Sequence, residues 1–212
     1  MGTDRLSIYS NGRRNDEVMD IAETVLNFFH KNFTKTIDKE QEELIQKAFR
    51  KESFQKKQLI FRNGDSNTKH YFIEKGLVRL YLIDSDGKEF NILFAKENQV
   101  IGDLSTPEPT EFNLESIERT TAWSIHETAL QKLIMSVHPG GFANRDTTLR
   151  RSYIHMQKRL TAILSNTAEV NYLEFRKQYP DFIQRLPQYH IASYLGISPE
   201  FLSKIIARTS KK

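Results

Sequence analysis

The chain has 212 residues, a formal net charge of +4 at pH 7, 38% hydrophobic residues and no cysteine. This apolar content and 14 phenylalanines support folded cores, which excludes a largely disordered chain. The lack of cysteine excludes disulfides, a thiolate nucleophile and cysteine-ligated iron–sulfur clusters. No apolar run approaches the roughly 20 residues that span a bilayer, and the first residues lack the apolar segment of a secretion signal. We therefore expect a cytoplasmic protein with no membrane partner.

The charge is unevenly distributed along the chain. Residues 150–212 hold 11 Lys and Arg against 4 Asp and Glu, a net charge of +7, whereas residues 1–149 hold 20 against 23. A basic C-terminal part beside a mildly acidic N-terminal part indicates that only the C-terminal part binds a polyanion. A solvated basic surface without a ligand is an equally frequent explanation of such a pattern.

Residues 15–50 carry two apolar stripes at helical spacing, and they predict helices that are interrupted near residues 33–36. We expect both stripes to be packing faces rather than binding surfaces, because their apolar residues repeat at the period of one buried helix face. From about residue 54 onward the period of strands replaces that of helices.

Residues 54–125 contain short runs rich in Ile, Leu, Phe and Tyr, which are typical of β-strands. Glycines at positions 64, 76 and 87 mark turns between these runs. Arg79 is a polar interruption of an otherwise apolar run. Several short strands at this spacing predict a β-sandwich or barrel, for which a filled core is the default and a small-molecule pocket is the alternative.

Residues 96–113 show neither period and predict a loop-like insertion. The helical period returns after Thr128, and a Pro-Gly-Gly sequence at 139–141 interrupts it. Beyond this break the sequence predicts one helix of about six turns, with apolar residues spaced like a heptad seam. The seam residues are Leu149, Tyr153, Met156, Leu160 and Ile163.

The seam could pack on its own domain or on a second copy of the chain. A charged face lies opposite the seam and favours the second alternative, a homodimer paired through a two-stranded coiled coil. The charged residues are Arg150, Arg151, Lys158 and Arg159. Residues 167–186 then indicate a short helix that ends at Tyr179-Pro180, followed by a connector.

The stretch from Pro187 to Lys212 consists of two short helical patterns on either side of Gly196. Gly196 permits the positive φ of a tight reversal. Ser198 is a favourable N-cap, and Pro199 is a favourable first helical residue. The second pattern has an apolar inner face and a polar outer face. Together they predict a helix-turn-helix whose second helix enters a DNA major groove.

A β-roll, a long seam helix and a helix-turn-helix, in this order, resemble the Crp/Fnr family of transcription regulators. The stretches that carry the resemblance are Ile60–Asp65, Tyr71–Gly76, Gly87–Phe94, Gly102–Leu104 and Leu186–Ile205, and it covers roughly residues 45–209. The resemblance implies an α+β protein in three parts. These parts are an N-terminal jelly roll of the cyclic-nucleotide-binding type with its preceding helices (1–140), a long dimerisation helix (141–166) and a helix-turn-helix domain (167–212). Because only residues 206–212 follow Ile205, we expect no full wing after the second helix.

Family members that bind cyclic nucleotides hold the phosphate with an Arg followed by Ser or Thr. The matching positions here are Thr110 and Glu111, and a carboxylate repels a phosphate. We expect neither cAMP nor cGMP to bind through this loop, so the effector is unknown. The resemblance assigns the effector pocket to Gly102, Asp103, Leu104, Thr110, Glu111, Asn144 and Arg145.

The resemblance also assigns a set of DNA-binding residues, which are Gln188, Tyr189, Ser198, Pro199, Glu200, Ser203, Lys204 and Arg208. Glu200 can accept a hydrogen bond from cytosine N4, and Lys204 can donate to guanine O6 and N7. Gln188, Tyr189 and Ser198 are placed to contact phosphates. As alternatives, Glu200 only complements the helix dipole and Lys204 is a solvated lysine.

We expect a DNA-binding transcription regulator that acts as a homodimer on a palindromic site. Its candidate partners are double-stranded DNA, a second copy of the chain and RNA polymerase. The alternative is a ligand-binding regulatory module whose C-terminal helices contact a protein partner. An enzyme is disfavoured because no GxSxG, P-loop or Rossmann glycine motif occurs and the six histidines lack metal-ligand spacing. No metal or cofactor is expected. The acidic residues at 103, 108, 111 and 115 could bind a cation, but they indicate a flexible acidic loop more strongly than a cation site.

Overall fold

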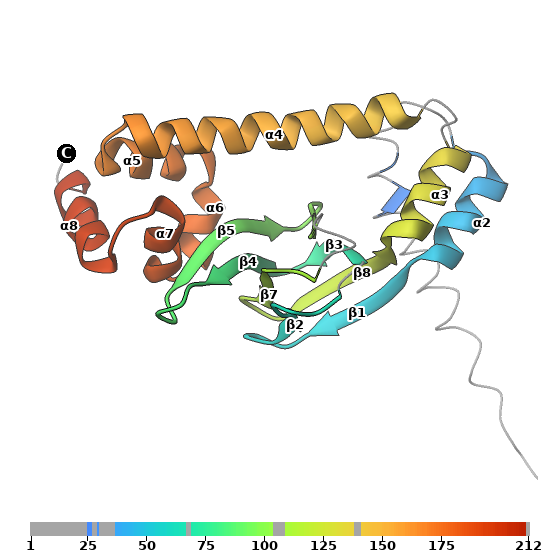
Figure 1. Cartoon of the computed structure of the whole chain (residues 1–212), viewed down its shortest axis with the longest axis horizontal. Helices are drawn as coiled ribbons and strands as arrows, with labels where there is room; N and C mark the ends of the chain where they lie inside the picture. Colours follow the sequence, from blue (N-terminus) through green and yellow to red (C-terminus); the bar gives the residue numbers. More distant parts are fainter. Residues whose placement is uncertain are drawn as a thin grey trace, which may run out of the picture.

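The computed structural model describes residues 25, 26, 29, 37–66, 69–103, 109–137 and 141–210, and for residues 137, 141–149 and 151 it describes the backbone alone. The N-terminal and sheet elements are α2 (Lys39–Ala48), β1 (Arg50–Phe54), β2 (Leu59–Phe61), β3 (Lys69–Lys75), β4 (Leu77–Ile83), β5 (Glu89–Lys96), β6 (Val100–Gly102), β7 (Asn113–Ser116) and β8 (Thr120–His126). The helices that follow are α3 (Glu127–Val137), α4 (Gly141–Ser165), α5 (Ala168–Gln178), α6 (Pro180–Arg185), α7 (Gln188–Leu195) and α8 (Pro199–Thr209). Figure 1 shows α4 running along the molecule, with α2 and α3 at one end and α5 to α8 at the other.

Strands β1 to β8 form two four-stranded antiparallel sheets, which we call the β-roll. The strand orders are β1-β8-β3-β6 and β2-β7-β4-β5. Apolar residues of both sheets form the core between them, among them Phe54, Phe61, Tyr71, Ile73, Val78, Leu80, Ile101 and Leu114. The prediction of an α+β protein with an N-terminal β-sandwich and a filled core is confirmed.

The predicted turns at glycines 64, 76 and 87 are confirmed, because all three have positive φ. Gly76 is the most constrained of them. Its φ is +113°, and a Cβ atom at this position would collide with Thr120 of β8. Glycine is therefore required where β3 turns into β4.

Helices α2 and α3 lie at one end of the β-roll and pack on the outer face of sheet β1-β8-β3-β6 there. Phe72 and Trp123 of the sheet pack with Ile45 of α2 and Leu133 of α3. Helix α2 begins with a capping box, in which the Asp38 side chain accepts from the backbone N–H of residue 41. Within the part of the chain described here, no helix combines the length and apolar character that a membrane span requires.

Three sequence-based boundaries are wrong. The predicted helix to residue 50 ends at Ala48, because Phe49 is extended and Arg50 already pairs in β1. The predicted loop 96–113 contains β6, three residues that pair with β3 and are too short to show an alternating pattern. The predicted connector contains α6, which begins at Pro180 and buries Phe182.

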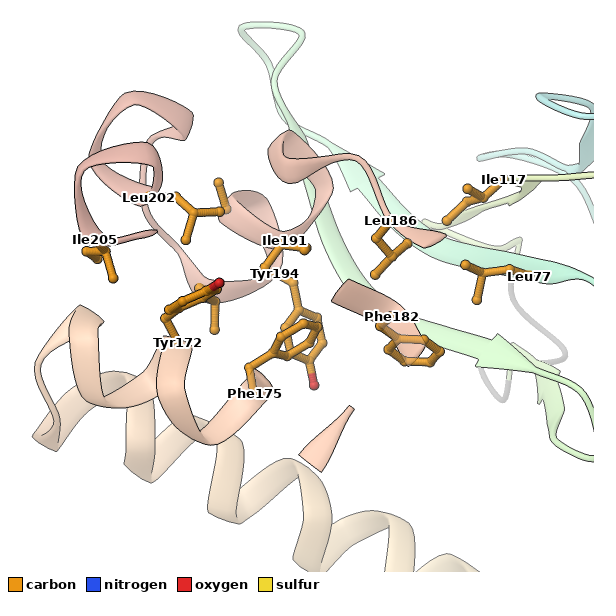
Figure 2. Packing of buried hydrophobic residues seen from close by; sticks show 12 residues of the cluster. Leu77, Ile117, Tyr172, Phe175, Phe182, Leu186, Ile191, Tyr194, Leu202 and Ile205 are labelled. Atoms are coloured by element: carbon orange, nitrogen blue, oxygen red, sulfur yellow. The ribbon is translucent and has the colours of Figure 1, made fainter. Parts of the chain in front are cut away.

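The C-terminal helices α5 to α8 share one apolar core, shown in Figure 2. Its largest members include Tyr172 and Phe175 of α5 together with Tyr194 of α7. Leu77 of β4 and Ile117 after β7 belong to the same cluster, so the helices pack directly on the β-roll. The division of the chain at residues 140 and 166 stays a prediction.

Candidate nucleic-acid interface

Helices α7 and α8 form a compact unit, which we call the α7–α8 pair. Gly196 ends α7 in the left-handed conformation, with φ 71° and ψ 26°. The N–H of Ile197 donates to the Ala192 carbonyl at 3.0 Å, which closes the end of the helix. The chain thus reverses over the three residues 196–198, as the sequence predicts.

The start of α8 follows the predicted capping pattern. Ser198 is the N-cap, and its hydroxyl accepts from the backbone N–H of Phe201 at 3.2 Å. Pro199 occupies the first helical position, where no backbone N–H is needed. Leu202 and Ile205 are fully buried and point from α8 into the shared core, as Figure 2 shows. The opposite side of α8 is therefore left facing solvent.

All eight residues assigned to DNA binding are exposed. A hydrogen bond joins the two helices within this set: the Ser203 hydroxyl of α8 donates to Gln188 Oε1 of α7 at 3.4 Å. Tyr189 is 50% exposed and its ring lies against His190. The structure thus places these side chains on the outer surface of the α7–α8 pair; their role in DNA binding stays a prediction.

The charged residues on this surface differ in their environment. Hydrogen bonds from its own backbone N–H and from Ser198 lower the pKa of Glu200 below its ordinary value, so Glu200 is ionised at neutral pH. Arg208 Nη2 lies 2.8 Å from Glu169 Oε2 of α5. Lys204, between them, is exposed. Lys204 is consequently the better placed of the two basic residues for a contact with a base.

A polar network, which we call the polar junction, connects the β-roll to the α7–α8 pair and to α4. Its members are Arg79, Glu89, Asn91, Glu115, Arg159, His190 and Ser193. At its centre Arg79 is only 4% exposed and donates to Glu89 at 2.5 Å and to Glu115 at 2.9 Å. Burial opposes the charged guanidinium, but the hydrogen bonds to the two carboxylates outweigh it and raise the pKa of Arg79.

His190 of α7 lies beside this buried arginine. Its Nδ1 atom is 3.3 Å from Arg79 Nη1 and 3.3 Å from Asn91 Nδ2. Burial, assisted by the charge of Arg79, lowers the pKa of His190 to about 4. The ring is therefore neutral at pH 7. Because two donors face Nδ1, that nitrogen accepts and the proton resides on Nε2.

Arg159 of α4 joins the same junction from the other side. It donates to the carbonyls of Ile92 and Tyr194, each at 2.8 Å, and to that of Asn91 at 3.1 Å. Its guanidinium also lies 3.9 Å from the centre of the Tyr194 ring. The expectation that Arg159 lies on a charged face opposite the seam is wrong, because Arg159 lines a hollow together with seam residues and donates its hydrogen bonds to backbone carbonyls of β5 and α7.

A second set of ion pairs holds α6 on the β-roll. Arg185 donates to both oxygens of Glu97 at 2.9 Å and also to Glu118. The Arg185 hydrogen bond lowers the pKa of Glu97 to about 2. Glu97 also accepts from the backbone N–H of Gly76 at 2.8 Å, which ties α6 to the β3–β4 turn.

The predicted seam on α4 lies on the exposed side of the helix. Tyr153 is 67% and Leu160 58% exposed, and Met156 and Ile163 are about 40% exposed. With Gln157 and Arg159 these residues line an open hollow of about 390 Å³. The side chain of Leu149 lies outside the described part of the chain. The four seam residues whose side chains are described therefore form an exposed apolar strip on α4.

The predicted effector pocket is only partly visible. Gly102 ends β6, and Asp103 and Thr110 are buried. Thr110 is held in the fold, since its carbonyl accepts from Gly64 at 2.8 Å and its N–H donates to Asp65 at 3.1 Å. Glu111 is exposed. Of the remaining assigned residues, Leu104 lies outside the described residues, and only the backbone is described for Asn144 and Arg145.

The acidic residues noted in the sequence do not come together in the described part of the chain. Glu115 points from β7 to Arg79 in the polar junction. Glu108 lies outside the described residues. No group of three or more His, Cys, Asp or Glu residues among those described is arranged to hold a metal ion.

Sequence analysis missed the polar junction. The sequence feature that pointed to it was Arg79, a polar residue in an apolar strand. The sequence did not indicate that Arg79 is buried. Its partner His190 lies 111 residues away in the chain, and Asn91 and Ser193 carry no motif.

The comparisons with known proteins agree with this architecture. Residues 51–137 match the family model of the cyclic nucleotide-binding domain. Among solved structures, the c-di-GMP-responsive global regulator CLP of Xanthomonas campestris aligns with a TM-score of 0.65 and 16% identity, over 82% of this chain and 92% of that one. A mutant of CooA from Carboxydothermus hydrogenoformans aligns with a TM-score of 0.63 and 17% identity, over 78% of both chains.

FixK2 of Bradyrhizobium japonicum aligns with a TM-score of 0.61 and 20% identity, over 77% of this chain and 85% of that one. The sequence has no match among curated proteins. Because all three identities are low, the structural likeness establishes a common fold and leaves the effector and the DNA site open. Residues 51–137 thus match the cyclic nucleotide-binding domain, and the chain has the fold of the Crp/Fnr-family regulators, which confirms the resemblance found in the sequence.

Proposed function

We propose that the chain is a DNA-binding transcription regulator that acts in the cytoplasm as a homodimer on a palindromic site. The observation that carries this proposal is the α7–α8 pair. A left-handed glycine turn precedes a capped helix, and this helix buries Leu202 and Ile205 and leaves a polar face, with Lys204 on it, open to solvent. This is the arrangement by which a helix-turn-helix presents its second helix to the major groove.

The residue types on this surface support contacts of two kinds. Glu200 and Lys204 lie on the exposed face of α8, where a carboxylate suits cytosine N4 and an ammonium suits guanine O6 and N7. Gln188, Tyr189 and Ser198 lie at the starts of the two helices and are suited to phosphate oxygens. The net charge of +7 over residues 150–212 supplies the attraction to a polyanion that does not depend on sequence.

The exposed strip on α4 supports the dimer. Tyr153 and Leu160 are large apolar residues that are more than half exposed, and they recur along one side of the helix. Pairing of two such helices would remove these residues from water. The two copies of α8 would then contact half-sites about one DNA turn, ~34 Å, apart.

The effector is neither cAMP nor cGMP in this proposal. A guanidinium that could hold a cyclic phosphate is missing from residues 80–118, and the nearest preceding one, Arg79, is engaged with two carboxylates in the polar junction. The buried Thr110 hydroxyl accepts from the backbone N–H of Phe112 at 3.1 Å, and the exposed Glu111 would repel a phosphate. A calorimetric titration should show no binding at micromolar cAMP, and micromolar affinity would overturn this part of the proposal.

DNA binding is tested with the full chain and a duplex that it selects from a random-sequence library. We expect fluorescence anisotropy to give specific binding that weakens steeply with salt. Lys204→Ala should cost about 1–3 kcal/mol on the selected duplex and less on a random duplex, because a base contact is lost. The matched control is Lys177→Ala, which removes an exposed lysine of α5 outside the α7–α8 pair and should leave specificity unchanged.

Two results would contradict the proposal in different ways. Equal losses of Lys204→Ala on selected and random duplexes would show that this lysine contacts only phosphate. No DNA binding even at low salt would favour the alternative, a ligand-binding module whose C-terminal helices contact a protein.

A further inference from the structure

The exposed face of α8 contains one large apolar side chain that the assigned DNA-binding set leaves out. Phe201 is the third residue of α8 and is 46% exposed. Leu202 and Ile205, on the inner face, are fully buried. Phe201 does not belong to the core cluster formed by the described residues of α5 to α8. The phenyl ring therefore contributes little to holding α8 in place and presents apolar surface to water.

The position of this ring on the helix is specific. It lies in the first turn, the end of a recognition helix that contacts base edges. The hydrogen bond from its N–H to Ser198 fixes this turn. Lys204 and Arg208 follow three and seven residues later, so both lie on the same side of the helix as Phe201. The exposed ring thus shares one side of α8 with two cations, the side that a polyanion would approach.

We propose that Phe201 contacts the 5-methyl group of a thymine in each half-site of the DNA. This inference rests on the proposed function and adds a determinant of its sequence preference. The thymine methyl is the apolar group on the base edges of the major groove, and phenylalanine is one of the side chains suited to it. The ring can neither donate to a base nor pair with a phosphate. Contact with the methyl group removes water from both apolar surfaces, which is favourable.

The test uses the full chain and the duplex selected from a random-sequence library. Each thymine of the selected site is replaced in turn by deoxyuridine, which lacks only the 5-methyl group. We expect wild-type affinity to fall about fourfold at one thymine position of a half-site, the effect of one buried methyl-sized group. Replacement in both half-sites should lower it roughly sixteenfold, because each copy of the chain loses one contact.

Variants identify the side chain responsible. Phe201→Ala should weaken binding to the thymine duplex and make the affinity indifferent to deoxyuridine at that position, whereas Phe201→Leu should keep part of the response. Lys204→Ala is the matched control. It weakens binding, but its response to deoxyuridine should equal that of the wild type because Phe201 is still present.

The outcomes separate this inference from the proposed function. Wild-type affinity that is unchanged by deoxyuridine at every position overturns the inference alone, and this measurement requires no variant to fold. Phe201→Ala with the full response to deoxyuridine also overturns it. A selection that yields no sequence motif overturns the proposed function and the inference with it.

Discussion

Strand β4 is buried on both sides, but only the side toward the C-terminal helices carries a buried charge. Val78 and Leu80 belong to the apolar core between the two sheets. Leu77 and Arg79, on the other side, face the C-terminal helices, and Arg79 is the centre of the polar junction. The same strand therefore contributes to the apolar core inside the β-roll and, through Arg79, to a charged network between the roll and the α7–α8 pair.

The difference lies in what each region requires of its members. Burial of apolar surface stabilises the folded chain in proportion to the area removed from water, and this stabilisation does not depend on the exact orientation of the side chains. Buried charges must first lose their hydration, and only well-placed partners offset that cost. We infer that the β-roll core mainly supplies stability, whereas the polar junction fixes the orientation of α7 and α8 on the roll.

The largest expected effect follows from removing the central charge of the polar junction. Arg79→Met should lower the free energy of unfolding by about 3–5 kcal/mol, because Glu115 stays largely buried without its partner. Adding Glu115→Gln in the same chain should recover most of this loss, since the unpaired charge is then removed. Urea unfolding measures both variants, and a second substitution that recovers nothing would contradict a charged junction.

Leu114→Ala is the matched change in the apolar region. Leu114 is fully buried and lies opposite Leu80 in the core of the β-roll. Its truncation should cost about 2–5 kcal/mol through lost burial and the cavity left behind. Glu115→Gln should give no recovery in this background. If Glu115→Gln raised the free energy of unfolding of both Arg79→Met and Leu114→Ala, its effect would not depend on an unpaired charge in the polar junction, and the contrast between the two regions would be contradicted.

A smaller effect concerns pH. The folded-state pKa of His190 is lowered from 6.5 to about 4, so between these values the unfolded chain binds a proton that the folded chain does not. The contribution of His190 to stability is therefore present above about pH 6.5 and is lost as the pH falls toward 4. His190→Asn keeps an acceptor near Arg79 and cannot titrate. Its unfolding free energy should depend less on pH than that of the wild type in this window, and equal dependence would place the titrating group elsewhere.

Much of the architecture could be predicted because the relevant signals are local. The turn glycines, the N-cap Ser198 and the left-handed Gly196 each act within a few residues, and the structure confirms them. Strand β6 and helix α6 could not be predicted in the same way. They are three and six residues long, and pairing with β3 and the burial of Phe182 determine them rather than periodicity.

The polar junction illustrates what periodicity leaves open. A heptad-like pattern on α4 separates an apolar face from a charged one, but it does not say which face meets the rest of the chain. The structure turns Arg159 inward to three carbonyls and leaves Leu160 facing solvent. Likewise, the sequence shows an arginine in β4 but not its partner. His190 could be identified as that partner only from the structure, in which α7 packs on the β-roll.

The most direct test of the account is sedimentation equilibrium of the full chain with its selected duplex. We expect two wild-type chains per duplex. Leu160→Asp places a carboxylate on the exposed strip of α4 and should lower the number to one while weakening specific binding. Met135→Asp changes a similarly exposed apolar residue of α3 and should alter neither quantity. One wild-type chain per duplex at full affinity, or no specific complex, would contradict a dimeric DNA-binding regulator.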